Sequence, residues 1–132
     1  MSDTVFSKII AGEVPSHKIY EDNKVLAFLD INPNNPGHTL VIPKREAEYV
    51  WDMTDDDYRY LMLIAKKLAL HLRQKLPYQY VGMQIVGLDV AYAHVHLIPF
   101  NATNQLYNKR TGTIDHNELA AMAKNLFISK LV

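Results

Sequence analysis

The run from Ala93 to Pro99, in which two histidines alternate with apolar residues, constrains the fold more than any other segment. Side chains two positions apart point to the same face of a β-strand, so this period of two predicts a strand over residues 91–100. His94 and His96 then face one side, while Val95 and Leu97 face the core. The same spacing suits two structural histidines, a zinc or copper site, or a nucleophile with its proton carrier.

The remaining hydrophobic patterns predict an α+β domain built on an antiparallel sheet, with all 132 residues in one domain. Gly12 ends a first helix, Thr54 begins a long one that Pro77 stops, and Asp115 begins the last one. Residues 101–113 are polar, and we expect them to be irregular and mobile. The expected helices cover residues 4–11, 54–76 and 114–130, and the expected strands cover residues 17–21, 24–31, 38–43, 79–86 and 91–100.

Composition excludes several classes of protein. Fourteen Lys and Arg balance fourteen Asp and Glu, so no excess charge favours nucleic acid or an anionic membrane as a partner. There is no cysteine, which excludes disulfides and thiolate metal sites and favours a cytoplasmic protein. We find no signal peptide, no apolar stretch long enough to span a membrane, and no glycine-rich phosphate-binding motif.

Four sequence blocks carry a family resemblance. They are Phe6–Pro15, Ala27–Pro33, Pro36–Lys44 and His94–Pro99. In this order and spacing they resemble the histidine-triad (HIT) family, and within it the Hint-like nucleotide hydrolases. The resemblance implies a HIT-like fold, with about five antiparallel strands, a long central helix, a short N-terminal helix and a C-terminal helix. It implies no cofactor.

The resemblance also implies roles for individual residues. His94 matches the nucleophile that attacks the α-phosphorus of a nucleotide ester, anhydride or phosphoramidate, which gives a nucleotidyl-histidine intermediate. His96 matches the residue that contacts the phosphate and the leaving group, and His38 matches the upstream histidine of the same site. Asp30 matches the acidic residue that holds the ribose hydroxyls. The residues that resemble the apolar slot for a purine are Phe6, Ile9, Phe28 and Ile31.

The chain departs from the family pattern at several positions. Tyr92 stands where the first histidine of the triad is expected, although its backbone carbonyl can still orient the nucleophile. Asp89 stands where a hydroxyl residue often faces the substrate, and its proton would suit a leaving amine. Related bacterial chains hold a structural zinc. Here the corresponding residues are Thr4, Ser7, Glu46 and Tyr92, so we predict that this zinc is absent.

Two other interpretations remain open at the sequence level. The chain could be a nucleotide-binding module with little or no turnover, or a metal enzyme that uses His38, His94 and His96. The family resemblance further implies a homodimer that forms around the long helix and the segment before it. The large side chains expected there are those of Trp51, Tyr58, Tyr60 and Leu61, whereas His17, His71 and His116 lie outside the matching blocks and are interpreted as surface residues.

Overall fold

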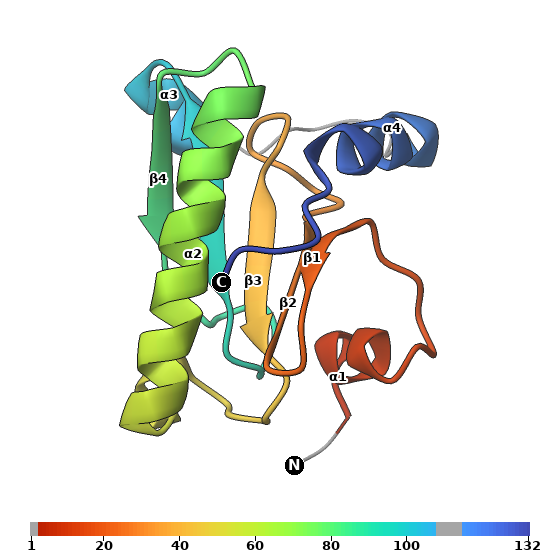
Figure 1. Ribbon diagram of the computed structural model, residues 1–132, viewed down its shortest axis with the longest axis vertical. Helices are drawn as coiled ribbons and strands as arrows, with labels where there is room; N and C mark the ends of the chain where they lie inside the picture. The colour runs from red at the N-terminus through yellow and green to blue at the C-terminus, as the bar shows by residue number, and fades with distance from the viewer. Residues whose placement is uncertain (1–2, 108–114) are drawn as a thin grey trace.

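The computed structural model, which describes residues 3–107 and 115–132, has the predicted α+β architecture (Figure 1). All strand pairs are antiparallel. In chain order the elements are α1 (Val5–Ile10), β1 (Lys18–Glu21), β2 (Val25–Leu29), β3 (Thr39–Pro43), the 3-10 helix η1 (Val50–Asp52), α2 (Asp55–Lys75), β4 (Tyr80–Gln84), β5 (Val95–Phe100), α3 (Thr103–Tyr107) and α4 (His116–Leu126).

The five strands form one sheet in the order β1-β2-β3-β5-β4. Helix α2 runs along one face of the sheet, and α4 lies beside β1 at the upper end in Figure 1. The short helix α1 packs on the opposite face, where Phe6 and Ile9 meet Leu26 and Phe28 of β2. The sheet therefore separates a thick layer, which contains α2, from a thinner layer, which contains α1.

Strands β2 and β3 are completely buried because both of their faces are covered. Alternate residues of β2 enter different layers: Val25 and Ala27 join the cluster under α2, and Leu26 joins the cluster under α1. Such strands are expected to have continuous apolar sequences, as the prediction for residues 38–43 assumed. In the register of the sheet His96 lies opposite Leu40, so its side chain belongs to the α1 face.

The prediction of a strand over residues 91–100 was too long, because β5 begins only at Val95. Just before the strand, the backbone N–H of Ala93 donates to the carbonyl of Ala47 at 2.8 Å instead of joining the sheet ladder. His94 therefore lies directly before the first residue of the strand and not within it. The two imidazoles still lie side by side, with ring centroids 5.0 Å apart.

The segment after β5 is not wholly irregular, since it contains the short helix α3. The side-chain oxygen of Gln105 accepts hydrogen bonds from the backbone N–H groups of Asn101 and Ala102, and it satisfies donors at the start of the helix. Leu106 then packs against Gly82 of β4. Residues 108–113 of the segment that was expected to be mobile lie outside the described residues.

The predicted caps of the two longer helices are present. The Thr54 hydroxyl accepts from the N–H of Asp57, and the Asp115 carboxylate accepts from two N–H groups in the first turn of α4. Helix α4 ends at Leu126, four residues earlier than predicted. The chain leaves the helix there because the N–H of Ile128 donates to the carbonyl of Ile19 at 2.9 Å.

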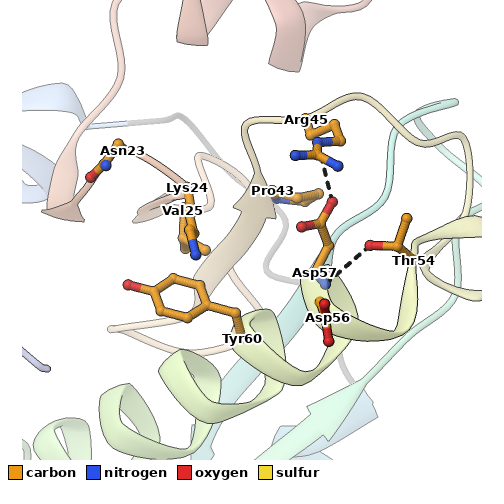
Figure 2. A pocket seen from close by; sticks show the side chains of 9 residues that line it. All are labelled: Asn23, Lys24, Val25, Pro43, Arg45, Thr54, Asp56, Asp57 and Tyr60. Carbon is orange, nitrogen blue, oxygen red and sulfur yellow. Dashed lines mark hydrogen bonds and ion pairs between the residues drawn. The ribbon is translucent and has the colours of Figure 1, made fainter.

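A surface pocket of about 430 Å³ lies where α2 begins, between Pro43 and Tyr60 (Figure 2). Its charged groups are largely engaged with one another: Arg45 pairs with Asp57 at 3.4 Å, and the Lys24 ammonium lies over the Tyr60 ring. None of the predicted site residues lines it. No helix in the described part of the chain is long and apolar enough to cross a membrane.

Candidate active site

The protonation of His94 is fixed by a backbone carbonyl. Its Nδ1 lies 2.6 Å from the carbonyl oxygen of Tyr92, and this side chain is almost completely buried. A carbonyl oxygen can only accept a hydrogen bond, so Nδ1 carries the proton of the neutral ring. The lone pair is therefore left on Nε2, which is the protonation state that a nucleophilic imidazole needs. The family resemblance implied this use of the carbonyl at position 92.

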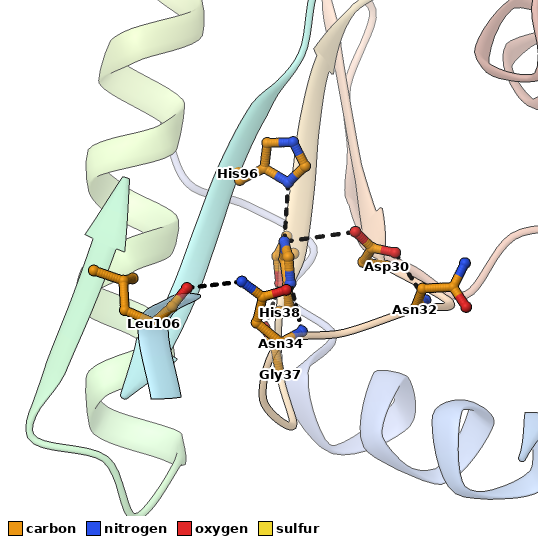
Figure 3. A network of polar contacts seen from close by, with 8 residues as sticks. Asp30, Asn32, Asn34, Gly37, His38, His96 and Leu106 are labelled. Atoms are coloured by element: carbon orange, nitrogen blue, oxygen red, sulfur yellow. Dashed lines mark hydrogen bonds and ion pairs between the residues drawn. The ribbon is translucent and has the colours of Figure 1, made fainter. Parts of the chain in front are cut away.

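The protonation of His38 is fixed in the opposite sense, by the contacts that Figure 3 draws. The backbone N–H of Asn34 points at Nδ1 of His38, 3.0 Å away. Because an amide N–H can only donate, Nδ1 must hold the lone pair and Nε2 the proton. His38 Nε2 lies 3.0 Å from Nδ1 of His96, so it donates there. His96 accepts on Nδ1 and carries its own proton on Nε2.

The environment of His96 keeps this ring neutral. The pKa of His96 is lowered to about 4, and burial is the largest cause. The neighbouring His38 and His94 also lower this pKa, by more than the carboxylates of Asp30 and Asp89 raise it. In its neutral form His94 thus offers a lone pair on Nε2, and the neutral His96 ring beside it offers an N–H. This pair of opposite polarity is the chemical core of the site.

The two acidic residues that were predicted for the site lie near these rings. One carboxylate oxygen of Asp30 accepts from the N–H of Asn32 at 2.8 Å, and the other lies 3.5 Å from Nε2 of His38. Asp89 is exposed and close enough to raise the pKa of His96. The structure therefore brings Asp30, Asp89 and all three histidines together.

The residues predicted to line an apolar slot divide into two groups. Phe6, Ile9 and Phe28 are buried in the cluster under α1, where the Phe6 ring meets the His94 ring edge-on at a centroid distance of 5.1 Å. Ile31 is exposed, at 44% of its surface. The three buried side chains belong to the apolar cluster that packs against the site, and Ile31 is the one of the four that is exposed to solvent.

Asp30, His38 and His96 are also spaced like metal ligands. Among the described residues, their ligand atoms form a set in which all lie within 4.8 Å of one another. The proton placement opposes such a site, because the atom of His38 that faces the set is Nε2, which carries the proton. A metal ion there would force that proton onto Nδ1, against the N–H of Asn34.

At the positions where a structural zinc was considered, this chain has its own hydrogen bonds. Thr4 and Ser7 form a reciprocal capping box at the start of α1. The Tyr92 hydroxyl donates to the Pro43 carbonyl at 2.6 Å, and burial together with the Glu46 carboxylate raises the pKa of Tyr92 to about 12. The phenol therefore stays protonated and ties the two segments together.

Several expectations about side chains outside the site are corrected. His71 is not a free surface residue, because its Nε2 lies 2.8 Å from the Leu126 carbonyl and joins α2 to α4. His17 and His116, in contrast, lie at the surface as predicted, with Nε2 of His17 3.0 Å from Nδ1 of His116. Leu61, predicted to belong to an interface, is completely buried in the core, because it falls on the inner face of α2.

Comparison with known proteins agrees with this geometry. The sequence model of the HIT domain family matches residues 11–103. The chain belongs to the HIT family. An uncharacterized HIT-like protein of Borreliella burgdorferi is 42% identical over 106 residues, which are 75% of this chain and 76% of the relative.

Two solved structures extend the comparison to the HIT fold. A HIT-like protein of Bartonella henselae, solved with an unknown ligand, superposes with a TM-score of 0.83 at 28% identity and covers 94% of this chain and 93% of its own. A HIT family hydrolase of Clostridium thermocellum superposes with a TM-score of 0.67 at 30% identity, and covers 78% of this chain and 95% of its own. The HIT fold therefore extends over most of the chain.

The lowered pKa of His96 predicts a pH dependence of stability. Between pH 6.5 and about 4 the unfolded state takes up a proton on His96 that the folded state does not, so the free energy of unfolding should fall as the pH decreases through this window. Urea unfolding of the wild type and of His96→Asn at pH 7 and pH 4.5 measures this. The variant should lose less stability between the two pH values. Equal losses would contradict the prediction.

The hydrogen bonds of Thr4, Ser7 and Tyr92 predict that α1 is held without a metal ion. Protein purified without chelator should contain far less than one zinc per chain, and EDTA should leave the melting temperature unchanged. Elemental analysis and thermal unfolding check this. One tightly bound zinc per chain, with a melting temperature that falls in EDTA, would show that the zinc site survives.

Proposed function

We propose that this protein is a hydrolase that cleaves a purine nucleoside phosphoramidate, ester or anhydride at its α-phosphate through a nucleotidyl-histidine intermediate. The observation that carries the proposal is the opposite protonation of two adjacent rings: Nε2 of His94 holds a lone pair and Nε2 of His96 holds a proton. A lone pair can attack phosphorus, and an N–H beside it can stabilise the negative charge of the phosphoryl oxygens.

In the first step the lone pair on Nε2 of His94 forms a bond to the α-phosphorus, and the bond from phosphorus to the leaving group breaks. The ring becomes cationic, and its Nδ1–H continues to donate to the carbonyl of Tyr92, which stabilises that charge. The leaving group departs with the bonding electron pair and takes up a proton. This proton comes from solvent, and we propose that the exposed carboxylate of Asp89, near His96, accepts a hydrogen bond from the departing amine.

In the second step water attacks the phosphorus and the phosphorus–nitrogen bond breaks. The products are a nucleoside monophosphate and the neutral His94 ring, and the proton that the water loses passes to solvent. One difficult displacement is thereby divided into two easier ones. Because backbone groups set the protons of His94 and of His38, which in turn donates to His96, the site needs little rearrangement between the two steps.

The nucleoside would bind beside the histidines. Asp30 is only partly buried, and its carboxylate can accept hydrogen bonds from two ribose hydroxyls. The exposed side chain of Ile31 follows it directly and offers an apolar surface for the base. Phe6, Ile9 and Phe28 would stiffen this surface from below.

Tyr92 in place of the first triad histidine bears on whether the site turns over. The relevant group at this position is the carbonyl, which any residue supplies and which already contacts His94. This favours an enzyme over a nucleotide-binding module that lacks activity.

The proposal predicts a covalent adduct on His94. Wild-type protein mixed with an adenosine phosphoramidate and quenched in acid should gain the mass of an adenylyl group, and steady-state hydrolysis should be measurable. His94→Ala should lose both, with a rate at least about 10³-fold lower, because it removes the nucleophile. Asp89→Asn should still form the adduct, but more slowly when the leaving group is an amine, because the amine departs in the step that forms the adduct. Nucleotide binding without adduct or turnover would identify a binding module instead.

We also propose that the protein is a homodimer. Strand β4 is at the edge of the described sheet and presents the half-exposed side chains of Tyr80 and Met83, and Trp51 near the start of α2 is 72% exposed. An edge strand with apolar side chains favours association with another chain. Sedimentation at micromolar concentration should give twice the mass of one chain, and Met83→Lys should shift it towards the monomer. A monomer in the wild type would contradict the proposal.

A further inference from the structure

Asn34 links two parts of the molecule that are far apart in the sequence (Figure 3). Its backbone N–H donates to Nδ1 of His38 at 3.0 Å. Its side-chain Nδ2 donates to the backbone carbonyl of Leu106 in α3 at 2.7 Å, which is the shorter of the two contacts. The residue that controls the protonation of His38 is therefore fastened to a helix 72 positions later in the chain.

Helix α3 itself is held against the outer strands of the sheet. The Leu106 side chain lies over Gly82 of β4, so closely that a Cβ at this glycine would come within 2.8 Å of Leu106 Cδ1. A methyl group at this place would have to displace the end of the Leu106 side chain. The absence of a side chain at Gly82 thus lets Leu106 pack closely on β4, in the same helix turn whose carbonyl accepts from Asn34.

We propose that Asn34 is a positioning residue, held by α3, that sets which nitrogen of His38 carries the proton and thereby makes His96 present an N–H to the substrate. If the Asn34 N–H moves away, the proton of His38 can also sit on Nδ1, although the Asp30 carboxylate 3.5 Å from Nε2 still favours the other position, so a mixture of tautomers results. Nε2 of His38 then becomes an acceptor, Nδ1 of His96 becomes the donor, and a lone pair on Nε2 of His96 faces the phosphate. The site would repel the anion it has to stabilise.

Proton positions can be measured without any substrate, so this part of the inference does not depend on the proposed function; only its catalytic consequence does. Two-bond ¹H–¹⁵N correlation spectra of the histidine rings distinguish a protonated ring nitrogen from one that holds a lone pair. In the wild type we expect the proton of His38 on Nε2, that of His96 on Nε2 and that of His94 on Nδ1.

Two variants weaken the contact between the Asn34 side chain and the Leu106 carbonyl, one from each side. Asn34→Ala removes the side-chain anchor but keeps the backbone N–H, and Leu106→Ala weakens the docking of α3 but leaves every site residue in place. Both should give a mixture of His38 and His96 tautomers, while His94 stays unchanged because Tyr92 holds it. Asn104→Ala, at an exposed position of the same helix, is the matched control and should keep the wild-type spectrum.

If both variants fold and keep the wild-type tautomers, the inference is wrong. A single variant that unfolds leaves the other to decide, and backbone amide spectra show which is the case. Where turnover exists, both variants should lower kcat about tenfold, the effect of one misdirected hydrogen bond, with KM nearly unchanged. Altered tautomers with an unchanged kcat would show that the proton positions of His38 and His96 do not affect catalysis, and would overturn the catalytic part of the inference. Wild-type protein with the expected tautomers but no turnover would contradict the proposed hydrolase and leave the role of Asn34 standing.

Discussion

The site depends on two backbone groups that act on imidazole rings in opposite directions. The Tyr92 carbonyl can only accept, so it holds the His94 proton on Nδ1; the Asn34 amide can only donate, so it forces the His38 proton onto Nε2. A side chain could rotate or titrate, but a peptide group does neither at ordinary pH. The polarity of the site is therefore part of the fold.

Burial makes this arrangement effective. His38 and His94 are almost inaccessible to solvent, and the pKa of His96 is lowered mainly by burial, so the His96 ring remains neutral and its hydrogen bond with His38 keeps one direction. The α1 layer provides the apolar side of the histidine site through Phe6, whose ring contacts the His94 ring. Without that layer, water would compete for both ring nitrogens.

The same proton placement bears on metal binding. Asp30, His38 and His96 are close enough to suggest a metal centre, yet the Asn34 N–H keeps the His38 proton on the nitrogen that would have to ligate. At the N-terminal side, Tyr92 and the Thr4–Ser7 capping box join segments through hydrogen bonds. The direction of these hydrogen bonds therefore opposes metal binding at three side chains whose spacing alone would suit it.

The sequence by itself determined the sheet and the long helix, because apolar periodicity, the Thr54 and Asp115 caps and Gly12 are local signals. It also indicated that His94 and His96 are neighbours, because side chains two positions apart in an extended chain point to the same face. Only the tertiary structure decided that the strand starts after His94, that α3 forms, and that Asn34 meets both His38 and Leu106. These features rest on contacts between distant segments, such as Ala93 with Ala47 and Leu106 with Gly82, and no local pattern encodes them.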